Sequence, residues 1–162
     1  MSIREARTED YKSIWPIFHD IVEAGETVAY SKGVTEDEAH HFWMEDPRKT
    51  YVFEKEGRIL GAYFLQTNQA GPGSHVCNCF YMVAPKERGQ GIATEMSLHS
   101  QKMAVELGYE AIQFNFVTAR NEEAVKLWLK QGFKTVGRIP RACKQHDHKY
   151  TDVLIMYKWI KE

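Results

Sequence analysis

The sequence predicts an α/β fold in which helices flank both faces of a central mixed, mostly antiparallel sheet. Strand-like stretches have clustered or alternating apolar residues, and helical stretches have apolar residues three and four positions apart. The two kinds follow one another in the order β-α-α-β-β-β-α-β-α-β-β. A length of 162 residues suits a single domain with its own core. We therefore treat residues 1–162 as one domain.

The first predicted elements are a short strand over residues 3–6 and an amphipathic helix over residues 8–25, in which Pro16 predicts a kink or a break. The stretch after this helix has no clear period and is expected to be a loop. Thr35 is followed three residues later by a glutamate, which is the pattern of a capping box. This capping box predicts the start of a second helix, which ends before Pro47.

A β-hairpin and a third strand follow. The hairpin is expected from residues 49–55 and 58–66, which flank a tight turn at Gly57. The third strand, residues 75–83, is rich in aromatic and β-branched residues and stops at Pro85.

The C-terminal half continues to alternate between helices and strands. A helix begins after Gly91 and ends at Gly108, which is expected to form a left-handed C-cap. Residues 111–117 alternate as a strand, and Asn121 caps the helix after it. The remaining predicted segments are a strand over residues 133–138, a polar connection over residues 139–149 that contains Pro140, and a final strand over residues 150–160.

Composition narrows the classes of function. Lys and Arg number 21 and Asp and Glu 22, so the net charge of −1 argues against a nucleic-acid binder. No apolar run is long enough to span a bilayer, and no signal-peptide pattern is present. Cys77, Cys79 and Cys143 form neither a disulfide framework nor a zinc pattern, so no metal is expected. A cytoplasmic protein fits these features best.

The most informative stretch is the short basic turn between the third strand and the next helix. Gly89 and Gly91 lack a Cβ atom, so an anion can approach the backbone, where the helix N-terminus offers free N–H groups. Lys86 and Arg88 add positive charge. The turn therefore predicts a pyrophosphate site. It lacks the Walker pattern, and Thr94 stands where a dinucleotide fingerprint has its third glycine.

Three short motifs occur together around this turn. Arg88-Gly89-Gln90-Gly91-Ile92-Ala93 fits the pattern Arg/Gln-x-x-Gly-x-Gly/Ala, Val83-x-Pro85 precedes it, and Asn121-x-x-Ala124 follows one helix and one strand later. Together they resemble the acetyl-CoA loop and neighbouring motifs of the GNAT N-acetyltransferases. The predicted order of elements is also that of the GNAT fold.

The resemblance implies that the chain binds acetyl-CoA and transfers its acetyl group directly to the amine of a small molecule, without an acyl-enzyme. Main-chain groups of Met82 and Val83 would pair with the pantetheine arm, and an N–H near Val83 would polarise the donor carbonyl. The family also allows a homodimer. The implied cofactor-binding residues are Met82, Val83, Arg88, Gly89, Gln90, Gly91, Ile92, Ala93, Thr94 and Asn121.

One departure from the family pattern concerns the general acid. Trp128 stands where many relatives have a tyrosine that protonates the coenzyme thiolate, and an indole N–H does not serve as an acid. Trp128 would then hydrogen-bond to or pack on the thioester, or simply be a core aromatic. Cys143, Tyr150 or water remain as alternative proton donors.

The identity of the general base is also open. The strand over residues 75–83 carries no Asp or Glu. Asn78 can orient a substrate but cannot act as a base. His75 has a suitable pKa but is also explained as an exposed residue at a strand end. Glu26, in the early loop, could attract or deprotonate an ammonium, or be a solvated acid.

A narrower resemblance points to the acceptor. Ser74 to Asn78 and Phe114 to Val117 are similar to stretches of the fungal azetidine-2-carboxylate N-acetyltransferases. That similarity implies that Asn78 handles the acceptor, that Asn115 contacts the coenzyme, and that the acceptor is a small amino-acid-like amine. The alternative functions are a non-catalytic acyl-CoA-binding module and a nucleotide-binding oxidoreductase.

Overall fold

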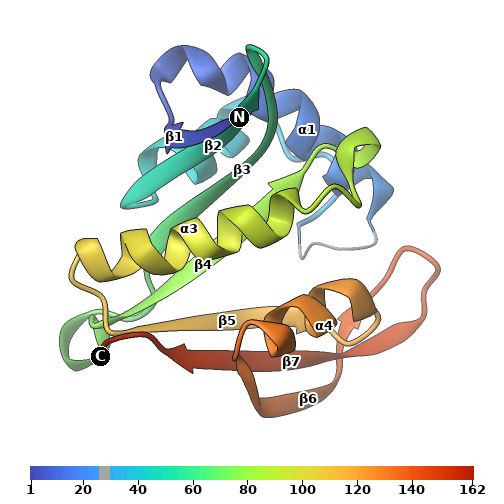
Figure 1. Ribbon diagram of the computed structural model, residues 1–162. Helices are drawn as coiled ribbons and strands as arrows, with labels where there is room; N and C mark the ends of the chain where they lie inside the picture. Colours follow the sequence, from blue (N-terminus) through green and yellow to red (C-terminus); the bar gives the residue numbers. More distant parts are fainter. Residues whose placement is uncertain (26–29) are drawn as a thin grey trace.

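The computed structural model describes residues 1–25 and 30–162. Within them, seven strands form one sheet in the order β1-β2-β3-β4-β5-β7-β6, and all neighbouring strands are antiparallel except β4 and β5 (Figure 1). This confirms the predicted mixed, mostly antiparallel sheet. The strands are β1 (Ser2–Glu5), β2 (Lys49–Lys55), β3 (Arg58–Thr67), β4 (Val76–Val83), β5 (Ala111–Thr118), β6 (Lys134–Lys144) and β7 (Tyr150–Trp159).

Two apolar cores lie on opposite faces of this sheet. Adjacent residues of β3 serve different cores, because successive side chains of a strand point to opposite faces. Phe64 packs in the core that contains Phe18 of α1, and Leu65 packs in the core that contains Met96 of α3 and Trp128 of α4. Helices therefore flank both faces, as predicted. The helices are α1 (Tyr11–Ala24), α2 (Glu36–His40), α3 (Ile92–Glu106) and α4 (Glu122–Lys130).

Short helical turns complete the description. They are the 3-10 turns η1 (Thr8–Asp10), η3 (Gly71–Gly73) and η4 (Pro85–Glu87), and the π-helical turn η2 (His41–Glu45), which continues α2. No helix among the described residues is long and apolar enough to cross a membrane.

In the N-terminal helices, the structure confirms one local sequence signal and departs from another. The Thr35 side chain accepts from the Glu38 N–H at 3.2 Å while the Glu38 carboxylate accepts from the Thr35 N–H at 2.8 Å, so the predicted capping box is confirmed. Pro16, in contrast, neither ends nor interrupts α1. The apolar stripe of this helix is buried on the sheet, and that burial outweighs the loss of one helical hydrogen bond.

A bulge changes the side-chain alternation in β5. Phe114 pairs with Met156 of β7, but the next paired residue, Val117, faces Leu154, so three steps along β5 match two along β7. Phe116, which strict alternation places with Phe114, is 43 % exposed, and Val117 is buried instead. The expectation of regular alternation through residue 117 is therefore wrong after Phe114.

The prediction of a polar connection over residues 139–149 is also wrong for the first half of this range. These residues belong to β6, which continues to Lys144. Pro140 is tolerated because β6 is an edge strand of the sheet. The pairing with β7 shifts between Ile139 and Cys143, and Arg141 in this interval has a positive φ of 54°.

A histidine of α3 is expected to make the stability of the fold dependent on pH. His99 Nδ1 lies 2.6 Å from the Tyr63 hydroxyl, and its ring meets the edge of Tyr51. Burial lowers the pKa of His99 below its usual 6.5; Lys102 lowers it further and Glu106 opposes the shift. The folded state thus binds fewer protons than the unfolded state at this site.

We therefore expect the free energy of unfolding to fall as the pH drops below about 6.5. His99→Gln should flatten that fall, because a neutral amide can face the tyrosine hydroxyl without titrating. Chemical denaturation of both proteins across pH 5 to 8 measures the difference. Parallel stability curves would show that another group causes the loss.

Candidate functional site

Strands β4 and β5 are paired only at their start. Val76 faces Ala111 and Cys77 faces Ile112 in parallel register, and beyond these pairs the strands separate (Figure 1). Within the described residues, the edge of β4 that faces β5 therefore has no strand partner from Asn78 onward.

The hydrogen bonds to β3 fix which main-chain groups of β4 point into this gap. Asn68 N–H donates to Val76 O at 2.9 Å and Ala84 N–H donates to Leu60 O at 2.8 Å, and the register between them is unbroken. Antiparallel pairing alternates, so the even-numbered residues of β4 face β3. The residues whose N–H and C=O groups point into the gap are Cys79, Tyr81 and Val83.

The two strand residues predicted to pair with the pantetheine arm, Met82 and Val83, therefore differ in the direction of their main-chain groups. The main chain of Val83 points into the gap. The main chain of Met82 faces β3, and its side chain is buried in the core beside α1. Along β4, Asn78 and Met82 lie on one face and Cys79 and Tyr81 on the other, and the pairing with β3 contains no bulge.

The predicted pyrophosphate turn connects β4 to α3. Gly89 and Gly91 have φ values of +79° and +80°, in the left-handed region that favours glycine. The first helical bond runs from Glu95 N–H to Gly91 O at 3.1 Å. The N–H groups of the three residues between them have no partner inside the helix, so they face outward at the positive end of the helix dipole.

This turn forms one end of a groove of about 310 Å³. The groove runs between the exposed edge of β4 and the N-terminal half of α4. Of the predicted cofactor-binding residues, Gln90 and Asn115 do not line it; the Gln90 amide donates to Glu87 at 2.9 Å. The lining residues are Tyr81, Met82, Val83, Glu87, Arg88, Gly89, Gly91, Ile92, Ala93, Thr94, Asn121, Glu123, Ala124, Leu127 and Trp128.

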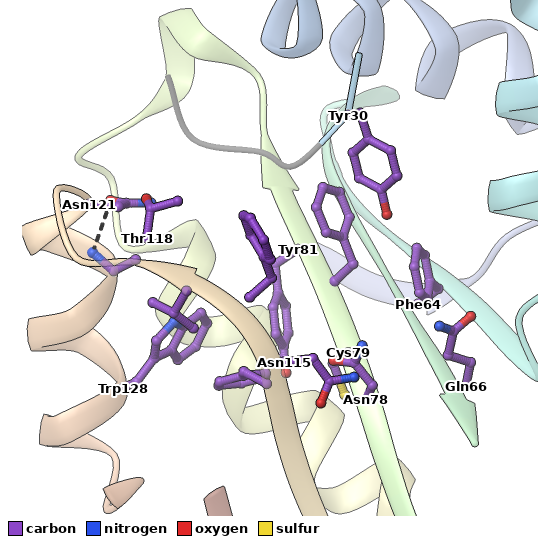
Figure 2. A pocket seen from close by; sticks show the side chains of 15 residues that line it. Tyr30, Phe64, Gln66, Asn78, Cys79, Tyr81, Asn115, Thr118, Asn121 and Trp128 are labelled. Atoms are coloured by element: carbon purple, nitrogen blue, oxygen red, sulfur yellow. Dashed lines mark hydrogen bonds between the residues drawn. The ribbon is translucent and has the colours of Figure 1, made fainter. Parts of the chain in front are cut away.

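A second hollow lies where β4 and β5 separate and has a volume of about 200 Å³ (Figure 2). We call it the acceptor cleft, because Asn78, which the resemblance implies handles the acceptor, lines it. It meets the groove, because Tyr81, Asn121, Ala124 and Trp128 line both. Its polar side chains are Gln66, Asn78, Asn115, Thr118 and Asn121, and its aromatic ones are Tyr30, Phe64, Phe80, Tyr81, Phe114, Phe116 and Trp128.

The described lining of the acceptor cleft carries no formal charge. None of the described residues that line it is an Asp, Glu, Lys, Arg or His. Burial raises the pKa of Tyr30, of Tyr81 and of the Cys79 thiol, so these three groups keep their protons near neutral pH. The cleft can form hydrogen bonds and ring contacts but contributes no charge.

Trp128 lines both hollows. Its ring centroid lies 4.7 Å from Phe114 and 5.1 Å from Tyr81, and the residue is only 8 % exposed. Trp128 is thus a core aromatic, one of the roles considered from the sequence, and it also lines the groove. The Tyr81 hydroxyl lies 2.6 Å from Ser100 Oγ, on the core side under α3.

The asparagines predicted for the site occupy three different positions. Asn78 is half-buried in the acceptor cleft, directly opposite Gln66 of β3. Asn115 is exposed; its Nδ2 donates to Asn68 Oδ1 at 2.6 Å, and it lines the acceptor cleft rather than the groove. Asn121 caps α4, with Oδ1 accepting from Ala124 N–H at 3.3 Å, and it lines both hollows.

The candidate bases are not in the described cleft. Glu26 lies outside the described residues. His75 lines neither hollow; its Nδ1 is 3.2 Å from Pro72 O and its ring meets Trp159. Among the described residues there is no group of three or more His, Cys, Asp or Glu side chains that could hold a metal ion.

Comparison with known proteins agrees with this geometry. The model of the acetyltransferase (GNAT) family matches residues 4–133. The chain belongs to the GNAT family. The resemblance drawn from the three motifs is thereby confirmed.

Several GNAT relatives are similar over different shares of the chain. A GCN5-related N-acetyltransferase from Kribbella flavida is 36 % identical, with a TM-score of 0.92 over 98 % of this chain and 96 % of that one. N-acetyltransferase aca1 of Schizosaccharomyces pombe is 32 % identical over 60 % of this chain, but the match spans only 47 % of the yeast protein. A putative acetyltransferase from Salmonella typhimurium, solved with its cofactor acetyl-CoA, shares the fold at 18 % identity and a TM-score of 0.86, over 100 % of this chain and 95 % of that one.

Sequence reasoning missed three residues of the cleft, Gln66, Tyr81 and Thr118. Gln66 could have been found, because it is the last residue of the predicted hairpin strand, which pairs with β4. Tyr81 lines both hollows, and the strand pattern alone does not indicate that position. Thr118 could not have been found from alternation, because the bulge in β5 determines the direction of its side chain.

Proposed function

We propose that this GNAT protein is an acetyl-CoA-dependent N-acetyltransferase that acts on a small amine. The observation that carries the proposal is the meeting of the phosphate-binding groove and the acceptor cleft at Tyr81 and Trp128. A donor held in the groove by its pyrophosphate would present its acetyl group at this junction. Proximity of two bound reactants can lower a barrier by about 7–11 kcal/mol.

The groove residues suit a CoA thioester. The N–H groups of residues 92–94 and the Arg88 side chain would hold the pyrophosphate, and the edge of β4 would pair with the pantetheine arm as an added strand. The N–H groups of Tyr81 and Val83 are the donors nearest the junction and would hydrogen-bond the thioester carbonyl. The Salmonella typhimurium structure with acetyl-CoA supports this choice of donor.

The acetyl transfer does not require a strong acid among the side chains of the site. The acceptor nitrogen bonds to the carbonyl carbon and loses a proton, the carbon–sulfur bond breaks, and the thiolate takes a proton. A CoA-like thiol has a pKa near that of cysteine, about 8.5, so it leaves without a strong acid beside it. The role of the cleft is then to orient a small amine through the Asn78 and Gln66 amides and the aromatic rings.

The decisive experiment is a screen of amines by release of free CoA thiol. The set contains matched pairs with and without a carboxylate: azetidine-2-carboxylate and azetidine, proline and pyrrolidine, phenylalanine and phenethylamine. Turnover of any amine supports the proposal. Tight acetyl-CoA binding with no turnover would favour the second candidate, a non-catalytic acyl-CoA-binding module, which the neutral cleft and Trp128 also suit.

Asn78→Ala tests the acceptor cleft. We expect kcat/KM for the acceptor to fall by about 10-fold or more, because one hydrogen bond to the substrate is lost. The dissociation constant of acetyl-CoA should stay within about twofold, because Asn78 does not line the groove. Gln69→Ala, which removes an exposed amide that lines neither hollow, is the control. A wild-type rate for Asn78→Ala would remove this residue from the site.

A further inference from the structure

A polar network joins the two helices that border the groove. Helices α3 and α4 lie on the same face of the sheet (Figure 1). The network is centred on Gln131, the residue that caps the C-terminus of α4. Its Oε1 accepts hydrogen bonds from Ser97 Oγ and, at 3.0 Å, from Gln101 Nε2. Its Nε2 donates to the main-chain oxygen of Thr94 at 3.4 Å. Across the described part of the chain, every hydrogen bond between α3 and α4 with its cap involves Gln131.

Lys158 of β7 anchors this network to the sheet. Its Nζ donates to Gln131 O at 2.7 Å and to Gln101 Oε1 at 2.6 Å. Ser97 is completely buried, and its hydroxyl has Gln131 Oε1 as its hydrogen-bond partner. A buried polar network is stable only in the arrangement that pairs its members. The network therefore fixes how α3 lies against the end of α4.

Gln131 contacts two walls of the groove without lining the groove itself. Thr94, Leu127 and Trp128 line the groove, whereas Gln131 lines neither the groove nor the acceptor cleft. Its side chain bonds to Thr94, and its main-chain N–H donates to Leu127 O and to Trp128 O at 3.1 Å. The sheet gives less support here, because α3 packs on β4, α4 packs on β5, and these strands separate after two residue pairs. Gln131 is therefore a direct link between the two walls.

We propose that Gln131 is a positioning residue of the donor site, which holds the first turns of α3 against α4 so that the N–H groups of residues 92–94 stay aimed at the pyrophosphate. The inference rests on the acetyl-CoA-dependent function proposed above. An anion site made of main-chain groups depends on how well its donors are held in place, and a misplacement of about 1 Å can cost about 100-fold in activity. Gln131 bonds to the main chain of Thr94, whose own N–H is one of these donors.

Gln131→Met tests this role, because methionine keeps the length of the side chain and lacks the amide. We expect the dissociation constant of acetyl-CoA, measured by isothermal titration, to rise by about 10-fold or more. The kcat/KM for S-acetylpantetheine, which has the thioester without the pyrophosphate, should stay within about twofold of the wild type. Thiol release with an amine that the wild type acetylates measures this second value.

A second variant separates positioning from stability. Gln131→Met leaves the buried Ser97 hydroxyl without its partner and should lower the melting temperature. Ser97→Ala in the same chain removes that hydroxyl, so the double variant should regain the melting temperature and keep the weak acetyl-CoA binding. Thr50→Val is the control. It removes a different buried hydrogen bond, from Thr50 Oγ1 to Trp43 O, and should lower the melting temperature without changing the affinity.

Three results would overturn the proposal. In the first, Gln131→Met binds acetyl-CoA as tightly as the wild type does. In the second, the double variant regains affinity together with stability. In the third, Gln131→Met loses as much activity with S-acetylpantetheine as with acetyl-CoA, because the effect then does not act through the pyrophosphate. A wild type that binds no acetyl-CoA would instead refute the proposed function itself, and the same titration shows this first.

Discussion

Gly91→Glu is expected to abolish acetyl-CoA binding while the protein stays folded. Gly91 has a φ of +80°, and a Cβ atom added there would meet nothing within 4 Å. The new side chain would therefore enter the open space in front of the α3 N-terminus, where the pyrophosphate is proposed to sit. It would place a negative charge against that anion and cover the N–H groups that bind it.

The loss of affinity should exceed about 100-fold, since both the anion contacts and the positive potential are removed. Isothermal titration with acetyl-CoA measures it, and circular dichroism reports the fold. Gly57→Glu is a close control. Gly57 also has a positive φ, +73°, and equally open space, but it lies in the turn between β2 and β3. The Gly57→Glu protein should have the same backbone strain and the same added charge, and it should still bind acetyl-CoA.

If Gly91→Glu binds acetyl-CoA as the wild type does, the phosphate turn is not the donor site. If both variants lose binding, the effect arises from backbone strain and not from the groove. Only a loss of acetyl-CoA binding in Gly91→Glu, with binding kept in Gly57→Glu, supports the proposed position of the pyrophosphate.

The contrast between the phosphate turn and β5 shows which features could be predicted from the sequence. The turn is defined by local chemistry: two glycines, a basic residue and a helix start are enough to predict its conformation. The capping box at Thr35 is local in the same way. Such signals do not depend on distant parts of the chain.

The acceptor cleft depends on distant parts instead. The bulge that directs Thr118 arises from pairing with β7, more than thirty residues later in the chain, and strict alternation cannot anticipate it. Strand β6 passes Pro140 only because the sheet order makes it an edge. The neutrality of the cleft is also a property of assembly, because its lining comes from β3, β4, β5, α4 and Tyr30 together.

That neutrality leads to the prediction with the largest effect, on the pH dependence of turnover. The described lining offers no group that can take a proton from an ammonium near neutral pH, since burial raises the pKa of Tyr30, Tyr81 and Cys79. We therefore expect the acceptor to bind as the neutral amine. We expect kcat/KM for the acceptor to rise about tenfold for each pH unit below the acceptor's own pKa and to level off above it.

Two acceptors whose ammonium pKa values differ by about two units distinguish this from catalysis by a protein base. The inflection of log kcat/KM should move with the acceptor, and at pH 7 the weaker base should react faster by up to about 100-fold if the two bind alike. An inflection that stays fixed for both acceptors and disappears in Glu26→Gln would identify that carboxylate as the base. A rate that follows only the acceptor in both proteins would show that the cleft selects for the uncharged nitrogen and leaves deprotonation to water.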